Sequence, residues 1–158
     1  MTGVDAPRWT YWVEPGRLLA GGYPGYALAA YEAARISLFV DLTEEHELEP
    51  YASLLPAWSR HARHPIRDMG VCTPELLAAT LDAIDEELDS GGRVYVHCWA
   101  GLGRTGTIVG CWLARHGRGG DDPVARIAEL RRQLADAWDP SPQTTQQRLL
   151  VRSWGYGD

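Results

Sequence analysis

Short apolar runs recur along this chain, and polar or glycine-containing segments separate them. Runs of this kind predict β-strands at 9–13, 17–20, 36–42, 62–66 and 93–96. The run at 36–42 is apolar at five of its seven positions, which is typical of a strand buried on both faces.

Helical periodicity is clearest at 73–89, where the apolar side chains share one stripe and the acidic ones lie largely off it. Thr73 is the expected N-cap and Pro74 the first helical residue. Further helices are predicted at 26–35 and 107–115, with a broken helical stretch at 47–58 that two prolines interrupt. The stripe consists of Leu77, Leu81, Ile84 and Leu88.

Asp122 and Pro123 have the residue types of a helix start, so another helix is expected to begin there. Its apolar residues recur at helical spacing, and we expect them all to face the core. These residues are Ile127, Leu130, Leu134 and Trp138.

Strands separated by helices predict an α/β fold, with a mostly parallel central sheet covered by helices on both faces. The 158 residues are enough for a single domain over 1–158. Right-handed crossovers would place the loop after 93–96 at the carboxyl end of a central strand, where such folds usually hold their sites.

The segment His97-Cys98-Trp99-Ala100-Gly101-Leu102-Gly103-Arg104-Thr105-Gly106 fills that loop. The free N–H groups of a helix N-terminus bind anions, and glycines let further N–H groups converge on the same point. Arg104 adds a planar charged fork for two phosphate oxygens. Cys98 would lie below the phosphate, where the same field stabilises a thiolate. The loop therefore predicts a phosphate site with its own nucleophile.

This His-Cys-x5-Arg-Thr pattern resembles the signature of cysteine-dependent protein tyrosine phosphatases, and the chain length favours their compact dual-specificity-like branch. The resemblance implies a phosphocysteine intermediate on Cys98, with Arg104 binding the phosphate and the transition state. It implies that Thr105 assists loss of the thiolate and that His97 holds the loop and helps keep the thiol acidic. No cofactor is implied. The implied phosphate-binding residues are Trp99, Ala100, Gly101, Leu102, Gly103 and Arg104.

Thiolate attack on a phosphate ester expels an oxygen that needs a proton from a general acid. Asp68 lies thirty residues before Cys98, on a predicted loop. The family that the signature resembles carries its acid aspartate at about this distance, so Asp68 is the candidate acid, and afterwards the base for the attacking water.

A weaker match lies near the C-terminus, where Gln147 and Val151 fit a Gln-x-x-x-Val helix that many members of the family carry. Two roles remain open for Gln147, positioning water or packing, and packing is favoured. Two roles also remain open for Cys111 and Cys72, a disulfide with Cys98 after oxidation or a packed core thiol, and the core thiol is favoured.

Composition and charge narrow the partners. The net charge is −6 with no basic stripe, so we expect neither nucleic acid nor an anionic membrane as a partner. We also expect the protein to be a monomer. Three cysteines favour a reducing cytoplasm over a disulfide framework. His61 and His64 alternate along a predicted strand and lack Cys or acidic partners at metal-ligand spacing, so no metal is expected. A solvated acidic face is expected from Glu44, Glu45, Glu47 and Glu49.

If the protein is an enzyme, two classes of substrate remain open. One is a phosphorylated protein, chiefly at tyrosine. The other is a non-protein phosphomonoester such as a phosphoinositide, an inositol phosphate or an RNA 5′-phosphate. The variable loop positions carry no charge, which disfavours substrates with additional phosphates, and Trp99 is expected to wall the pocket. A phosphate-binding module without catalysis is the third alternative, although the chain keeps cysteine, arginine and acid.

Overall fold

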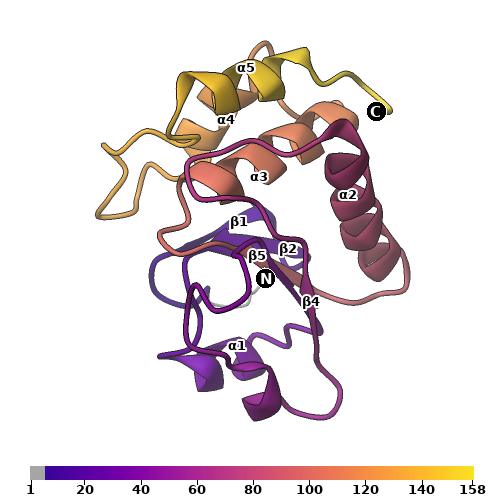
Figure 1. Ribbon diagram of the computed structural model, residues 1–158, viewed down its shortest axis with the longest axis vertical. Helices are drawn as coiled ribbons and strands as arrows, with labels where there is room; N and C mark the ends of the chain where they lie inside the picture. Colours follow the sequence, from indigo (N-terminus) through magenta and orange to yellow (C-terminus); the bar gives the residue numbers. More distant parts are fainter. Residues whose placement is uncertain (1–5) are drawn as a thin grey trace.

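The structure is a computed structural model that describes residues 6–158; the first five residues of the predicted domain lie outside this range. Figure 1 shows a central sheet with helices on either side. Its elements are, in chain order, β1 (Thr10–Glu14), β2 (Leu18–Gly21), α1 (Leu28–Ala33), β3 (Leu38–Asp41), a 3-10 turn η1 (Ala52–Leu54), β4 (Arg60–Arg63), α2 (Pro74–Asp89), β5 (Val94–His97), α3 (Gly103–Arg115), α4 (Pro123–Leu130) and α5 (Thr145–Ser153).

The five strands form one sheet in the order β1-β2-β5-β3-β4. Only β1 and β2 run antiparallel; the other neighbours are parallel. The predicted mostly parallel sheet is therefore confirmed. β5 lies in the middle of it, so the loop after β5 leaves from the carboxyl end of the central strand, as expected.

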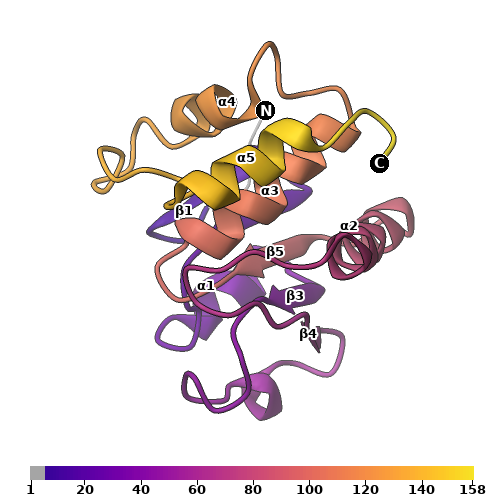
Figure 2. The same cartoon turned by 45° about the horizontal axis from the view of Figure 1, so that its top comes forward.

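The core lies on both faces of the sheet, because successive side chains of each strand point to opposite faces. On one face, Val94 and Val96 of β5 join the side chains of α2, α3 and α4. On the other face, Tyr95 packs with Tyr31 of α1 and with Phe39. Figure 2 shows α2–α5 on one side of the sheet and α1 on the other. The predicted two-sided covering is confirmed.

The helix α2 matches its prediction closely. The Thr73 hydroxyl caps it by accepting the N–H of Leu76, Pro74 stands in its first turn, and its four predicted apolar residues are buried. It is 16 residues long. None of the helices within residues 6–158 is long and apolar enough to cross a membrane.

The segments predicted at 47–58 and 62–66 differ from the structure. The stretch 47–58 holds only the three-residue η1, because proline at 50 and 56 cannot supply the N–H groups that a continuous helix needs. The strand predicted at 62–66 is observed at Arg60–Arg63 instead. Its pairing begins where Arg60 aligns with Leu38 of β3; beyond Arg63 the N–H of His64 donates to the Asp41 carbonyl and that of Ile66 to the Leu42 carbonyl, so the regular register ends there.

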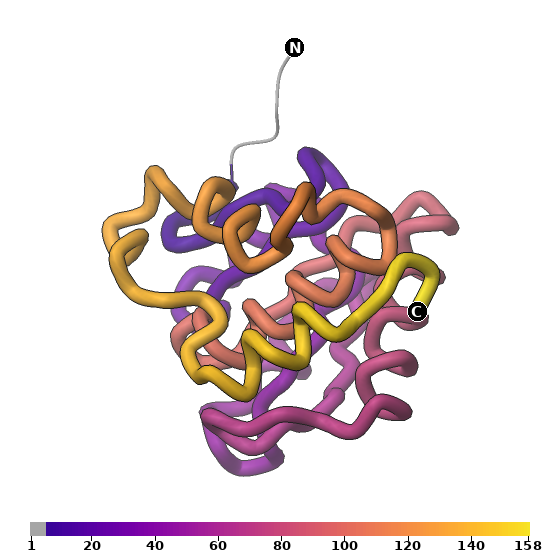
Figure 3. Tube along the Cα trace, turned by 90° about the horizontal axis from the view of Figure 1, so that it is seen from above, coloured from indigo at the N-terminus to yellow at the C-terminus, as the bar shows by residue number. Residues whose placement is uncertain are grey.

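The expected inner face of the helix after Asp122 is only partly correct. Ile127 is buried, but α4 ends at Leu130 and Trp138 is 97% exposed. The buried Arg131 explains this ending, since its guanidinium donates to the carbonyl oxygens of Asp136 and Asp139 and thereby folds the next segment into turns. The connection from α4 to α5 consequently runs along the edge of the molecule (Figure 3).

Candidate active site

Cys98 comes directly after β5, and α3 begins five residues later at Gly103. Cys98 is almost fully buried, and the hydroxyl of Thr105 donates a hydrogen bond to its sulfur at 3.1 Å. The helix thus begins four residues earlier than the segment predicted at 107–115. Because Thr105 belongs to the first turn of α3, the sulfur lies beside the positive end of the helix dipole.

Neighbouring segments fix the backbone of this loop. Gly101 has a φ of 78°, and a Cβ there would lie 2.6 Å from the carbonyl carbon of Gly21, so only glycine fits. The N–H of Tyr23 donates to the carbonyl of Trp99 at 2.9 Å, and the hydroxyl of Ser141 donates to that of Leu102 at 2.7 Å. These two hydrogen bonds fix the Trp99 and Leu102 carbonyls of the loop to neighbouring segments.

Arg104 is 2% exposed at its side chain, and its guanidinium is held on one edge. Nη1 and Nη2 donate to the two carboxylate oxygens of Glu47 at 2.8 and 2.7 Å, and Nη1 also donates to the carbonyl of Ile66 at 2.9 Å. These bonds from Arg104 hold the pKa of Glu47 below its usual range. A bidentate pair of this kind fixes both the position and the plane of the guanidinium.

Glu47 was expected on a solvated acidic face; the residue is exposed, but its carboxylate is paired with Arg104. Its side chain is 25% exposed and paired with Arg104, 57 residues away in sequence. A turn explains its position: the N–H of Glu47 donates to the carbonyl of Glu44, which directs residues 44–47 back over the loop. Sequence reasoning missed this residue because the segment carries four glutamates within six positions and nothing local distinguishes one of them.

Asp68 lies on the loop between β4 and α2, with its side chain 65% exposed. Its Oδ1 is 3.3 Å from Nη2 of Arg104, so the structure brings the candidate acid to the same guanidinium. A turn closed by the N–H of Gly70 and the carbonyl of Arg67 shapes this part of the loop. Beside it is a shallow hollow of about 440 Å³, lined by Glu44, Glu45, His46, Glu47, Arg67 and Asp68.

Gln147 is buried and connects three segments. Its Nε2 donates to the carbonyl of Gly70 in the Asp68 loop, while its Oε1 accepts the N–H groups of Gln143 and Thr144 and so completes the cap of α5. All these partners are backbone groups, which agrees with the favoured packing role. Gln143 was not singled out from the sequence; its side chain reaches Gly103, where a Cβ would lie 2.6 Å from Gln143 Oε1.

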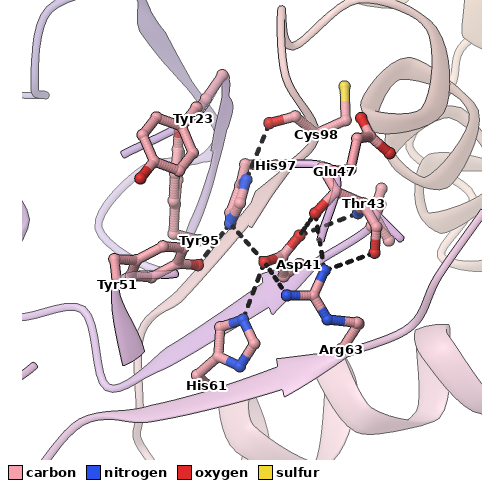
Figure 4. A network of polar contacts seen from close by, with 12 residues as sticks. Tyr23, Asp41, Thr43, Glu47, Tyr51, His61, Arg63, Tyr95, His97 and Cys98 are labelled. Carbon is pink, nitrogen blue, oxygen red and sulfur yellow. Dashed lines mark hydrogen bonds and ion pairs between the residues drawn. The ribbon is translucent and has the colours of Figure 1, made fainter. Parts of the chain in front are cut away.

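His97 is the last residue of β5, and its ring lies on the side of the Cys98 carbonyl rather than on that of the sulfur (Figure 4). It is fully buried; its Nδ1 is 3.0 Å from the carbonyl oxygen of Cys98, and its Nε2 is 2.5 Å from the hydroxyl of Tyr51. Burial lowers the pKa of His97, although the nearby Asp41 opposes that shift. Tyr51 was not predicted; only the fold brings it to His97.

The remaining candidates are accounted for by packing and pairing. His61 bonds to Asp41 and His64 to Thr80, and no group of three or more His, Cys, Asp or Glu among residues 6–158 could hold a metal ion. The three cysteines are free thiols. Burial raises the pKa of both Cys72 and Cys111, as expected for thiols packed against the core.

A mostly parallel sheet with a Cys-x5-Arg loop at the carboxyl end of its central strand defines a cysteine-dependent phosphatase of the tyrosine and dual-specificity type. The chain belongs to the PTP-SAK family, because the model of that family, described as "Swiss Army Knife protein, DSP-PTPase phosphatase domain", matches residues 7–152. This confirms the dual-specificity-like branch that the signature indicated.

Among curated relatives, protein 067L of Invertebrate iridescent virus 3, which carries a tyrosine phosphatase name, is 35% identical over 109 residues. The match covers 62% of this chain and 42% of that protein. Dual specificity protein phosphatase 1 of Mus musculus is 41% identical over 54 residues, covering 34% of this chain and 15% of that protein. The chain therefore spans less than half the length of these relatives.

Solved structures confirm the fold. A mutant form of Tk-PTP has a TM-score of 0.74 at 25% identity, with 92% of this chain and 93% of that chain covered. PTPMT1 in complex with PI(5)P has a TM-score of 0.69 at 19% identity, with 91% and 95% covered. The second likeness concerns the fold alone.

Proposed function

We propose that this protein hydrolyses phosphotyrosine in proteins through a phosphocysteine intermediate on Cys98. The observation that carries the proposal is the meeting of three groups: the Cys98 sulfur at the start of α3, the fixed guanidinium of Arg104, and the Asp68 carboxylate 3.3 Å from that guanidinium. Attack on a phosphate ester needs a nucleophile, a binder of the phosphoryl oxygens and an acid for the leaving group.

In the first step the thiolate of Cys98 attacks phosphorus, the ester P–O bond breaks, and the leaving oxygen takes the proton of Asp68. In the second step water attacks the phosphocysteine, Asp68 accepts a proton from that water, and the S–P bond breaks to release phosphate. Thr105 donates to the sulfur at 3.1 Å in the resting site and would stabilise the departing thiolate in the same way.

Arg104 would bind the phosphoryl group through the edge that Glu47 leaves available. Glu47 and the Ile66 carbonyl occupy Nη1 and one proton of Nη2, and the Asp68 carboxylate lies 3.3 Å from Nη2, whereas Nε has no hydrogen-bond partner within residues 6–158. The Nε–Nη2 edge matches two oxygens of a phosphate in one plane. The backbone N–H groups of Trp99, Ala100, Gly101, Leu102 and Gly103 would surround the same oxygens.

The charge of the hollow beside Asp68 supports a phosphoprotein over a polyanionic substrate. The hollow beside Arg104 is lined mainly by carboxylates, and the variable loop positions carry no charge. Extra phosphates on an inositol ring or an RNA end would meet repulsion there. Trp99, 64% exposed within the loop, offers an aromatic wall for a tyrosine ring.

Rates on a panel of substrates test this proposal. We expect kcat/KM on a phosphotyrosyl peptide to exceed that on a phosphoseryl peptide, on PI(5)P vesicles and on an RNA 5′-phosphate. Cys98→Ser should abolish turnover but retain binding of the peptide, because a hydroxyl stays protonated where a thiolate would form. A preference for PI(5)P or RNA would overturn the substrate class. Phosphate binding without turnover by the wild type would favour a non-catalytic module.

We further propose that the protein acts as a monomer in the cytoplasm, without a nucleic-acid or membrane partner. The net charge of −6 and the three free thiols support this. Sedimentation of the purified protein and fractionation of its native cells test it; a dimer or a membrane-bound pool would contradict it.

A further inference from the structure

The side chain of His97 is enclosed by partners on both ring nitrogens. Nδ1 is 3.0 Å from the carbonyl oxygen of Cys98, and Nε2 is 2.5 Å from the hydroxyl of Tyr51. Figure 4 shows the ring between the Cys98 carbonyl and Tyr51, with Asp41 near the same end of the ring as Tyr51. Because His97 is fully buried, water cannot replace either partner.

The two partners determine which nitrogen carries the proton of a neutral ring. A carbonyl oxygen only accepts, so Nδ1 must be the donor in that bond. A neutral imidazole with its proton on Nδ1 has a lone pair on Nε2, which needs a donor. Tyr51 can supply it, because burial raises its pKa and keeps the hydroxyl protonated. The neutral Nδ1–H form of His97 therefore satisfies every atom.

The charged form of His97 competes with this neutral form, because Asp41 is positioned to stabilise an imidazolium. Parallel pairing aligns Asp41 of β3 with His97 of β5 on one side and with Arg63 of β4 on the other. The Asp41 Oδ2 is 3.9 Å from Nε2 of His97. At that distance a carboxylate favours the charged form of histidine.

Asp41 is kept from closing this gap by its other partners. Its Oδ1 accepts both the N–H and the hydroxyl of Thr43, at 2.9 and 2.6 Å. Its Oδ2 accepts Nε2 of His61 at 2.9 Å and lies 3.5 Å from Arg63. These hydrogen bonds hold the pKa of Asp41 far below its usual range, so it stays an anion. His61 and Arg63, which are partners of Asp41, also lower the pKa of His97, and the ring of Tyr95 stacks on His97 with 5.6 Å between the ring centroids.

We propose that Tyr51 and Asp41 are positioning residues that set the protonation state of His97: the Tyr51 hydroxyl holds it neutral, and Asp41 supplies the charge that would otherwise protonate it. This rests on the proposed function for its catalytic meaning. The neutral ring keeps the Cys98 carbonyl turned back toward β5 and away from the phosphate. The thiolate is then balanced by the loop N–H groups and Thr105, and phosphoryl transfer does not depend on an imidazolium that titrates near neutral pH.

Nitrogen NMR of the full chain, labelled with ¹⁵N-histidine, tests the protonation state directly. We expect His97 to show a protonated Nδ1 and a bare, hydrogen-bonded Nε2 from pH 5.5 to 8. A proton on Nε2, or a ring that titrates within this range in the wild type, would overturn the proposal. The readout needs no turnover, so it stands apart from the test of the proposed function.

Tyr51→Phe should favour the imidazolium form of His97, because Nε2 then loses its hydrogen-bond donor while Asp41 remains. We expect the His97 midpoint to rise by about one to two units, into the measured range. The pH profile of Cys98 alkylation by iodoacetamide should gain a second ionisation at the same midpoint. Tyr31→Phe is the matched control, since Tyr31 is buried in the same aromatic cluster but bonds Tyr95, and it should change neither signal.

Asp41→Asn distinguishes the role of Asp41 from that of Tyr51. We expect His97 to stay neutral in Asp41→Asn, and the new titration of Tyr51→Phe to disappear in the double variant. An unchanged His97 midpoint in Tyr51→Phe, or a new titration that persists in the double variant, would contradict the proposal. Where Tyr51→Phe does not fold, the wild-type spectrum decides alone, because a neutral Nδ1–H ring is required.

Discussion

Glu47 holds the guanidinium of Arg104 through both carboxylate oxygens, at 2.8 and 2.7 Å, and so fixes the plane of this arginine in the first turn of α3. The pair joins the turn after β3 to the first turn of α3. Hydrogen bonds between charged groups contribute more to stability than those between neutral groups, and here the side chain of Arg104 is nearly buried. The orientation of Arg104, the proposed phosphate-binding residue, therefore depends on a glutamate far away in sequence.

Replacing Glu47 by Gln should weaken catalysis because one edge of Arg104 loses its charged partner. A charge-assisted pair is worth about 1.5–3 kcal/mol, so we expect kcat/KM on an aryl phosphate to fall by roughly 10- to 100-fold. Glu45→Gln is the control, since that exposed glutamate makes no contact with Arg104. Equal activity of both variants would show that Arg104 needs no support from Glu47.

The same pair predicts a pH dependence of stability. Because the folded pKa of Glu47 is lowered by Arg104, its contribution is fully present above the unfolded value of about 4.3 and is lost as pH falls through the folded value. The difference in unfolding free energy between wild type and Glu47→Gln should be constant above about pH 5.5 and shrink below about pH 4.3. Chemical denaturation at several pH values measures it; a difference that grows on acidification would contradict the pairing.

Asp68→Asn should reveal the general acid through the leaving group. Loss of the acid costs most when the departing oxygen is basic, so we expect a fall of about 10²–10⁴-fold on phosphotyrosine and much less on an ester with an acidic phenol. The measurement is log kcat/KM against leaving-group pKa for both enzymes. Asp89→Asn on the exposed end of α2 is the control. Equal slopes for wild type and Asp68→Asn would exclude Asp68 as the donor.

The three thiols should differ in reactivity. Burial raises the pKa of Cys111 far above its usual range and raises that of Cys72, so neither forms a thiolate readily. We expect iodoacetamide near pH 7 to label Cys98 in the folded protein and to leave the other two unmodified, as read by peptide mass spectrometry. Phosphate should protect Cys98. Labelling of Cys111 at a comparable rate would show that the core around α3 opens easily.

Gln147→Ala should act on stability more than on chemistry. The substitution removes the bond to the Gly70 carbonyl and both bonds to the N–H groups before α5. We expect a loss of about 1–3 kcal/mol in thermal or chemical unfolding. The kcat of Gln147→Ala on an aryl phosphate should fall less than tenfold. Gln146→Ala, at an exposed neighbouring position, is the control. A stable variant that has lost its hydrolysis step would instead support a water-positioning role.

Sequence by itself determined the elements whose signal is local. The strand before Cys98, the capped helix α2 and the loop between Cys98 and Arg104 follow from apolar periodicity, from a Thr-Pro start and from the spacing of Gly101 and Arg104. Each of these depends on residues within one or two turns of each other. Asp68 was different, because it was chosen from the family resemblance, which places an acid aspartate about thirty residues before the cysteine, on a loop between two predicted elements.

Tertiary structure alone decided which of the polar residues meet. Glu47 and its glutamate neighbours look alike in sequence, and only the turn after β3 selects the one that reaches Arg104. Likewise, the alignment of three parallel strands places Asp41 between His97 and Arg63, and packing brings Tyr51 onto His97. Trp138 shows the converse, since helical spacing predicted burial but Arg131 ended the helix first. Long-range pairing depends on strand register and on buried hydrogen bonds, and no local pattern encodes these.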